Sequence, residues 1–185
     1  MPSLYLGSVI GYYILLFGAM CFIFLLFSTT IVNLMVQVPF VPTSKRVINY
    51  IVNLANLKKG EKVYDLGCGD GRFLFEAQKI TQTTAKGFEM APIPYFWARI
   101  RQLISKAKVK IAMTNFFYIN LKDADVIYCY LAPEAMTKLS TKFQNECKKG
   151  TRIYSHTFPI HSMEPTKVWA KNKQKRLPSV YLYQI

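Results

Sequence analysis

The sequence predicts an α/β fold, a doubly wound and mostly parallel sheet that is preceded by one transmembrane helix. Two observations lead to this prediction. Residues 1–44 contain no Lys, Arg, Asp or Glu, and from residue 45 onward short apolar runs alternate with segments of helical periodicity. About 140 residues follow the uncharged segment, which suffices for one compact core and not for two. We therefore expect residues 1–38 to form an anchor and residues 39–185 to form one domain.

The uncharged N-terminal segment is apolar from Leu4 to Val38. About 20 apolar residues cross a bilayer, so we expect the crossing near residues 8–30. A cleaved secretory signal is the alternative, but the segment lacks a basic start and its apolar core is too long. Lys45 and Arg46 follow the span, whereas no charged side chain precedes it. The positive-inside rule then predicts a single-pass membrane protein with its domain on the cytoplasmic, or equivalent inner, side.

The net charge of +14 lies entirely in the second part of the chain. Basic residues attract nucleic acid or anionic membrane surfaces, and beside a membrane span the lipid headgroups are the better explanation. For that reason we expect no nucleic-acid partner. The cysteines are far apart and, together with the two histidines, form no zinc pattern, so we also expect no bound metal. These residues are Cys21, Cys68, Cys129, Cys147, His156 and His161.

Proline, glycine and periodicity delimit the elements of the domain. Pro39 and Pro42 break a continuing helix, Thr43 or Ser44 can cap the next one, and that helix is expected to end before Gly60. Further helices are expected at residues 71–80, 95–107 and 134–147, the second with its basic face outward. Strands are expected at residues 62–66, 85–88, 109–113, 124–130 and 152–155, and a final hairpin at 167–170 and 180–184.

One turn carries most of the chemical signal, because the first expected strand ends in DLGCGDG, residues 65–71. Glycine lets a backbone approach a ligand closely and adopt positive φ angles, and ligands of such sheets bind at the carboxyl ends of the strands. A dinucleotide fingerprint needs a small third residue where this chain has Arg72. An aspartate before the glycines suits a cationic or amine-bearing ligand better than a pyrophosphate.

Glu89 ends the next expected strand, about 20 residues after the glycines. A carboxylate at this position can accept hydrogen bonds from both hydroxyls of a ribose. A simple loop charge is the alternative. The chain has only ten acidic residues, however, and Asp65, Asp70 and Glu89 are three of them.

Asp65 to Gly71, together with Glu89, resembles motif I and its acidic partner in class I S-adenosylmethionine-dependent methyltransferases. MTNFF, residues 113–117, resembles the end of that family's third strand, where an Asp or Asn binds the adenine amine. The resemblance implies a minimal, Rossmann-like methyltransferase domain over residues 39–185 and S-adenosyl-L-methionine as the cofactor. The cofactor-binding residues that it implies are Asp65, Leu66, Gly67, Cys68, Gly69, Gly71, Glu89, Met90, Asn115 and Phe116.

A narrower resemblance rests on PFVPTS, DLGCGDGR, YLAPEAMTKLSTKF and KKGTRIYSHTFPI. These segments are similar to the small membrane-anchored lysine methyltransferases that modify the ATP synthase c subunit and the adenine nucleotide carrier. The resemblance implies a protein-lysine N-methyltransferase that acts on a membrane-associated protein. Two alternatives stay open: a lipid or small-molecule N-methyltransferase at the membrane surface, and a cofactor-binding scaffold without turnover.

The acceptor side is expected after the fourth strand, where class I enzymes place it. Tyr130 and Glu134 are the catalytic candidates, and Tyr128 is a substrate candidate. The alternative is that Tyr128 faces the sheet interior and that Glu134 only favours a helix N-terminus. Pro42 and Thr43 belong to a segment, residues 39–44, that is expected to fold over the cofactor as a lid or else to be a stiff linker. The absence of an NPPY-like motif argues against a nucleic-acid amino methylase.

Overall fold

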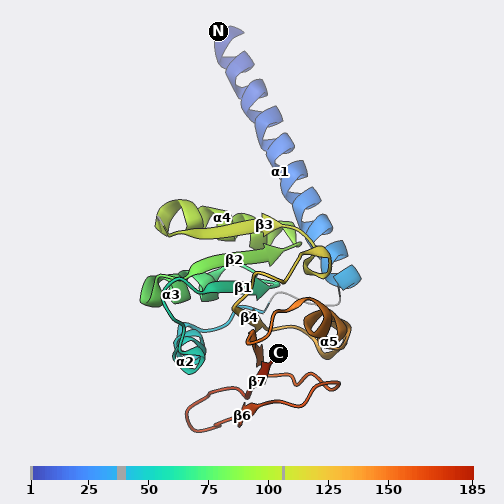
Figure 1. The fold of residues 1–185 in the computed structure, drawn as a ribbon. Helices are drawn as coiled ribbons and strands as arrows, with labels where there is room; N and C mark the ends of the chain where they lie inside the picture. Colours follow the sequence, from blue (N-terminus) through green and yellow to red (C-terminus); the bar gives the residue numbers. More distant parts are fainter. Residues whose placement is uncertain (1, 37–40, 106) are drawn as a thin grey trace.

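The computed structural model describes residues 2–36, 41–105 and 107–185, with the side chains of residues 2–6, 33, 35 and 36 left aside. The described chain folds around a seven-stranded sheet in the order β3-β2-β1-β4-β5-β7-β6 (Figure 1). The elements in chain order are α1 (Pro2–Val36), α2 (Lys45–Ala55), β1 (Lys62–Leu66), α3 (Arg72–Thr81), β2 (Thr84–Glu89), α4 (Pro92–Ser105), β3 (Val109–Met113), the 3-10 helix η1 (Phe116–Tyr118), β4 (Val126–Cys129), α5 (Pro133–Glu146), β5 (Arg152–His156), β6 (Lys167–Trp169) and β7 (Val180–Gln184).

The topology confirms the predicted α/β, doubly wound and mostly parallel sheet. Strands β1 to β5 pair in parallel, and only β7 and β6 are antiparallel. The expected strands at 62–66 and 109–113 have the observed bounds, and the predicted hairpin is the β6–β7 pair. Ser44 caps α2, since its side chain accepts a hydrogen bond from the Val47 amide. The helix ends at Asn56, whose left-handed backbone stops it four residues before Gly60.

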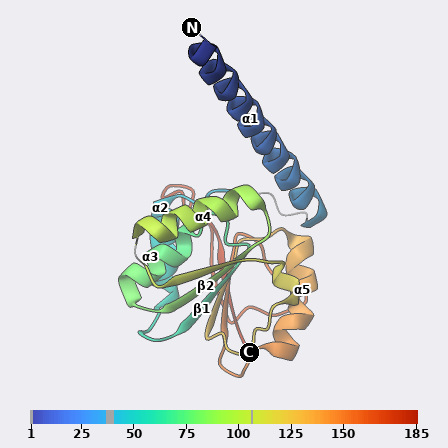
Figure 2. The ribbon, with the colours of Figure 1, turned by 90° about the horizontal axis from the view of Figure 1, so that it is seen from above.

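Helices cover both faces of the sheet, as doubly wound folds require. Helices α2, α3 and α4 lie on one face, and α5 covers the other (Figure 2). Their inward side chains complete two separate cores, one around Ile51, Leu74 and Val63 and one around Leu139, Phe143 and Ile127. Because both faces are covered, the central strands β1 and β4 are buried almost throughout. The rigid sheet holds the loops at its carboxyl edge in fixed positions.

Helix α4 presents apolar as well as basic side chains to solvent. The sequence predicted residues 95–107 with the basic face outward, and the helix spans Pro92–Ser105 with Arg99 and Arg101 exposed. Large apolar side chains, among them Phe96, Trp97 and Leu103, are exposed beside them. One of its arginines, Arg101, turns back to Asp70, with Nη2 donating to Oδ2 at 2.9 Å. The outward face of α4 is therefore largely apolar.

Helix α1 projects from the domain and its C-terminal end packs beside α4 (Figures 1 and 2). The Ile93 amide donates to Thr29 Oγ1 at 3.3 Å, which joins the start of α4 to α1. Gly7–Val32 is long and apolar enough to cross a membrane, with a mean hydropathy of 2.5. It is compatible with the predicted anchor. The predicted domain boundary after residue 38 lies outside the described residues.

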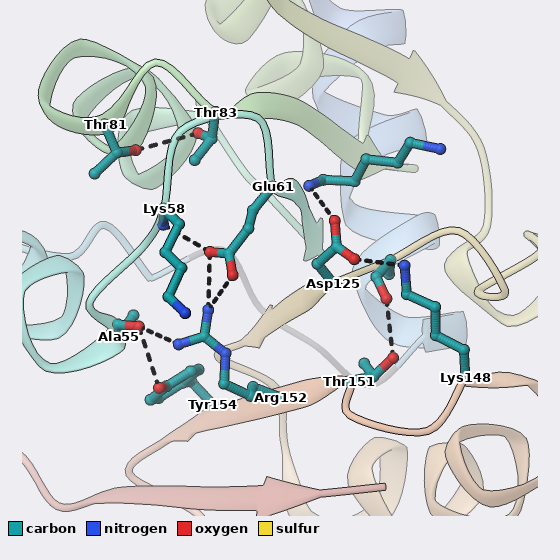
Figure 3. Close-up of polar contacts among 12 residues, drawn as sticks. Ala55, Lys58, Glu61, Thr81, Thr83, Asp125, Lys148, Thr151, Arg152 and Tyr154 are labelled. Carbon is teal, nitrogen blue, oxygen red and sulfur yellow. Dashed lines mark hydrogen bonds and ion pairs between the residues drawn. The ribbon is translucent and has the colours of Figure 1, made fainter.

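A polar network fastens the amino edge of the sheet, opposite the glycine turn (Figure 3). Arg152 Nη2 donates to both oxygens of Glu61 at 2.8 Å, and its Nη1 donates to the Ala55 carbonyl at 2.6 Å. The Lys58 amide also donates to Glu61. Since Ala55 ends α2, Glu61 precedes β1 and Arg152 begins β5, this group joins three elements. The side chains of Glu61 and Arg152 are only 19% and 21% exposed.

We predict that Glu61→Gln destabilises the chain by about 1–3 kcal/mol, because it leaves the half-buried Arg152 without its carboxylate partner. Urea unfolding of the detergent-solubilised chain measures this loss. Asp123→Asn is the matched control: its ion pair with Lys62 is exposed, so its effect should stay within about 0.5 kcal/mol. Equal effects of the two substitutions would contradict a structural role for the Arg152 network.

Candidate active site

The glycine turn, residues 67–71, is built by positive φ angles and by close contact with β2. Gly67, Gly69 and Gly71 have φ angles of +74°, +56° and +74°. The amides of Gly67 and Cys68 both donate to the Phe88 carbonyl, at 2.9 and 3.1 Å. A Cβ on Gly67 would lie 2.8 Å from Leu131 Cδ2. The turn therefore needs glycine both for its backbone and for its space.

Glu89 lies directly against this turn. Its Oε2 accepts from the Gly69 amide at 2.8 Å, and its Oε1 accepts from the Ala91 amide at 2.8 Å. Burial raises the pKa of Glu89, and these backbone donors oppose the rise. The carboxylate thus sits at the carboxyl edge between the loops that follow β1 and β2, where the sequence predicted it. Its binding to a ribose stays a prediction.

Asp65 is the most isolated acid of the site. Its side chain is buried, with 2% of the residue exposed, and no described residue donates a hydrogen bond to it. Burial raises the pKa of Asp65 well above its ordinary value of 3.8, and the charges of Glu89 and Asp70 add to the rise. A buried carboxylate without a donor is costly. It suits a ligand that brings a cationic or amine group.

Asp70 joins the glycine turn to the predicted lid. Its carboxylate accepts from Arg72 Nε at 2.8 Å and from Arg72 Nη2 at 2.6 Å, and Arg72 Nη1 donates to the Thr43 carbonyl at 2.7 Å. Burial raises the pKa of Asp70, but the hydrogen bonds and charges of Arg72 and Arg101 outweigh it, so the pKa is lowered overall. The residue that breaks the dinucleotide fingerprint, Arg72, is therefore the link between turn and lid.

The predicted adenine-side residues lie at the end of the next strand. The Thr114 amide donates to the Glu89 carbonyl at 3.1 Å, which brings Asn115 beside Glu89 in the edge of the sheet. Asn115 Oδ1 accepts from the Phe117 amide at 2.9 Å and caps η1. Phe116 is buried, and its Cε1 would lie 3.7 Å from a Cβ on Gly67. Leu66 is fully buried in the core, Cys68 is buried, and Met90 is partly exposed.

An open pocket of about 450 Å³ lies against residues 41–44, the described part of the predicted lid. Pro42 and Thr43 line it together with Tyr130, so the predicted lid and one predicted catalytic residue meet there. Its rim includes three cations from the β6–β7 loop, Lys171, Lys173 and Arg176. Glu134 is exposed on the first turn of α5 and is not among the pocket's lining residues. Tyr128 is buried in the sheet and stacks on Phe73, with 3.9 Å between ring centroids.

His156 completes this pocket and was not predicted as a site residue. Its Nδ1 shares a hydrogen bond of 2.8 Å with the Tyr128 hydroxyl, and its ring stacks on Tyr130 with centroids 4.0 Å apart. Burial lowers the pKa of His156 to about 4, so the imidazole is neutral at ordinary pH. Burial also raises the pKa of Tyr128 well above its ordinary value, as does the charge of Asp65, while Thr43 opposes the rise. The signal in the sequence was a histidine at the end of an expected strand.

Gly87 is a second residue that the sequence reasoning missed. A Cβ there would lie 2.6 Å from Cys68 Sγ and 2.7 Å from Leu74 Cδ1. Gly87 lies in β2 beside Asp65 of β1. It lets the glycine turn and α3 pack against the sheet, a role that only the spatial neighbours reveal.

Known proteins are similar to this chain in sequence. The model of the ANTKMT methyltransferase domain matches residues 65–167. A protein-lysine N-methyltransferase of Saccharolobus islandicus (strain REY15A) is 32% identical over 80% of this chain and 94% of its own length. The adenine nucleotide translocase lysine N-methyltransferase of Mus musculus is 30% identical over 80% of this chain and 69% of its own.

A solved structure shares both the fold and part of the sequence. The crystal structure of an RNA methyltransferase from Salinibacter ruber in complex with S-adenosyl-L-homocysteine has a TM-score of 0.72 and 26% identity. It covers 78% of this chain and 94% of that chain. S-adenosyl-L-homocysteine is the demethylated form of the cofactor that the sequence implied. With its turn, its carboxylates and these relatives, the chain belongs to the ANTKMT methyltransferase domain family and is a class I S-adenosylmethionine-dependent methyltransferase.

Proposed function

We propose that this chain is a membrane-anchored protein-lysine N-methyltransferase whose substrate is a membrane-associated protein. The observation that carries the proposal is the pocket that Tyr130 and His156 line together with residues 41–44. Arg72 joins Thr43 of that segment to Asp70 in the glycine turn. The two curated relatives, at 32% and 30% identity, both bear lysine methyltransferase names. The pocket and the similar proteins thus both support an amine as the methyl acceptor.

The residues of the donor side fit S-adenosyl-L-methionine. When bound, this cofactor supplies an electrophilic methyl group. Asp65, a buried carboxylate without a donor, suits the cofactor's ammonium group, and Glu89 suits its ribose hydroxyls. We assign Asn115 to the adenine amine, since its Oδ1 already caps η1 while its amide nitrogen has no partner among the described residues.

The acceptor side must hold a lysine amine in its neutral form. A lysine has an ordinary pKa of about 10.4, and only its deprotonated amine has the lone pair that accepts a methyl group. An apolar pocket disfavours the charged form, and so does a cationic rim. The rim formed by Lys171, Lys173 and Arg176 supplies that repulsion. Among the pocket's lining residues there is no carboxylate to stabilise an ammonium.

Within this pocket we assign the contact with the amine to Tyr130. Its hydroxyl can hydrogen-bond the amine, and its ring can stabilise the methylated cation. His156 stacks on that ring at 4.0 Å and is itself held by the Tyr128 hydroxyl. We therefore assign His156 and Tyr128 to positioning. Glu134 is not needed in this arrangement, because it lies outside the pocket lining.

The anchor restricts the enzyme to targets at the bilayer. The apolar segment Gly7–Val32 supports a span, and Lys45 and Arg46 beyond it support the cytoplasmic, or equivalent inner, side for the domain. Residues 41–44 both follow α1 and line the acceptor pocket. Tethering raises the effective concentration of the active site toward lysines at the same surface.

The first prediction of this proposal concerns the product. Membranes from cells with and without this chain, compared by mass spectrometry, should differ by added methyl groups on lysine of one or a few membrane proteins. Labelled cofactor incubated with such membranes should label protein. Label found only in the lipid extract would replace the proposal with the lipid methyltransferase alternative, and label only in RNA would replace it with the activity named for the Salinibacter ruber structure.

The second prediction concerns Asp65. Asp65→Asn should weaken binding of S-adenosyl-L-methionine by about tenfold or more, because it removes the charge proposed to face the ammonium. The same substitution should stabilise the cofactor-free chain. Because the folded pKa of Asp65 is raised above 3.8, its carboxylate costs stability as pH rises above that value, so the advantage of the variant should grow with pH.

Calorimetry and thermal unfolding between pH 5 and 8 measure both effects of Asp65→Asn. Asp123→Asn, an exposed carboxylate far from the turn, is the control and should change neither. Unchanged cofactor binding in Asp65→Asn would refute the role assigned to this residue.

The third prediction concerns His156. His156→Ala should lower kcat by about 10- to 100-fold through misplacement of Tyr130, with the cofactor Kd unchanged. His156→Asn, which can still bond the Tyr128 hydroxyl, should recover part of the rate. Since the folded pKa is lowered to about 4, the parent loses stability as pH falls from 6.5 toward 4, and His156→Ala should reduce that loss. Equal rates for all three proteins would contradict the positioning role.

A further inference from the structure

Helix α4 exposes an apolar stripe that the fold of the domain does not use. Five large side chains on its outward face are between 45% and 78% exposed: Phe96 at 49%, Trp97 at 59%, Ile100 at 45%, Leu103 at 78% and Ile104 at 77%. The opposite side of α4 already fastens the helix to the sheet. Ala98 is fully buried there, and Gln102 Nε2 donates to the Val109 carbonyl at 2.5 Å. The side chains of the stripe therefore do not contribute to the core of the domain.

The stripe has the angular pattern of a helix that lies in a membrane interface. At about 100° per residue its five side chains span an arc of about 120°. Arg99 borders the arc on one side and Arg101 borders it on the other. Lys108 and Lys110, which follow α4 into β3, are exposed as well. An apolar arc between cations, with a tryptophan in it, fits the boundary between acyl chains and anionic headgroups.

The stripe is also continuous with the segment that we propose to span the membrane. Helix α1 packs against α4, and the Ile93 amide at the start of α4 donates to Thr29 Oγ1 at 3.3 Å. Thr29 lies near the end of the apolar segment Gly7–Val32. Figure 1 shows α4 along the side of the sheet from which α1 projects, and Figure 2 shows α4 exposed on that side.

We propose that α4 is a second, interfacial membrane contact, with its apolar arc inserted at the headgroup boundary and Arg99 and Lys108 on anionic headgroups. The inference rests on the proposed anchor and adds an orientation to it. A single spanning helix lets a domain rotate, whereas a second contact beside it fixes one edge of the sheet against the bilayer. Arg101 extends from this helix to Asp70 in the glycine turn, so the membrane contact and the cofactor site share one rigid element.

The test uses the full chain reconstituted in phosphatidylcholine–phosphatidylglycerol vesicles. The chain has two tryptophans, so Trp169→Phe leaves Trp97 as the only one. Bromine atoms placed high on the acyl chains quench fluorophores about 5–10 Å below the surface, and Trp97 should lose about half of its emission relative to unbrominated vesicles. Trp97→Phe is the matched control. Its Trp169 stacks on Tyr154 in the domain and should keep its emission.

A second variant distinguishes insertion of α4 into the lipid from a position of α4 near the bilayer that only the anchor causes. Leu103→Gln with Ile104→Gln should remove most of the quenching of Trp97 while leaving the cofactor Kd unchanged, since neither residue belongs to the site. Vesicle flotation is measured on the same samples. A chain that floats but shows no quenching of Trp97 overturns the interfacial contact and leaves the anchor intact. If Trp97 is not quenched and chemical cross-linking joins two copies of the chain through α4, the interfacial contact is overturned in favour of self-association. A chain that fails to float overturns the anchor itself.

Discussion

The site depends on one carboxylate that holds two loops together. Glu89 accepts a hydrogen bond from Gly69 in the turn after β1 and another from Ala91 in the turn after β2, each at 2.8 Å. Both amides would otherwise be free donors at the carboxyl edge of the sheet. The bond to Gly69 requires the turn to come close to β2, which the positive φ angles of the glycines and the missing side chain of Gly87 permit. The same carboxylate is the one that we propose for the ribose, so in this proposal the group that shapes the turn also binds the cofactor.

A second carboxylate, Asp70, connects the glycine turn to its neighbouring elements. Asp70 binds Arg72 and Arg101, and through Arg72 it reaches the Thr43 carbonyl in the segment that follows α1. The glycine turn is thereby joined to residues 41–44 on one side and to α4 on the other. In a chain with a net charge of +14, acidic residues are scarce. Asp65, Asp70 and Glu89 lie within the turn or directly against it. Asp70 binds the arginines, and Asp65 is the one that we propose for the ligand.

The sequence predicted the parts of the fold that local pattern determines. The strands, the final hairpin and the Ser44 cap follow from apolar runs and capping chemistry, and the turn follows from DLGCGDG. What it missed depends on contacts between distant elements. Gly87 is needed because Cys68 and Leu74 pack on it, and His156 joins Tyr128 and Tyr130 only once β4 and β5 pair. The arginines of α4 are exposed as predicted, but the sequence did not predict the apolar side chains beside them or the bond from Arg101 to Asp70. These contacts join residues that are distant in the sequence, so a local sequence pattern cannot predict them.

The proposed reaction brings two amines into one site in opposite protonation states, and the distribution of charge matches this demand. The amino group of the cofactor must stay an ammonium to be held, whereas the lysine amine must be neutral to react. Asp65, Asp70 and Glu89 gather on the donor side, where they favour a cation. Lys171, Lys173 and Arg176 gather on the acceptor rim, where they disfavour one. Because Tyr128 reaches from the Asp65 side of the sheet to His156, a neutral pair of rings separates the two environments. In the proposed reaction, each amine therefore meets charges of the sign that its role requires.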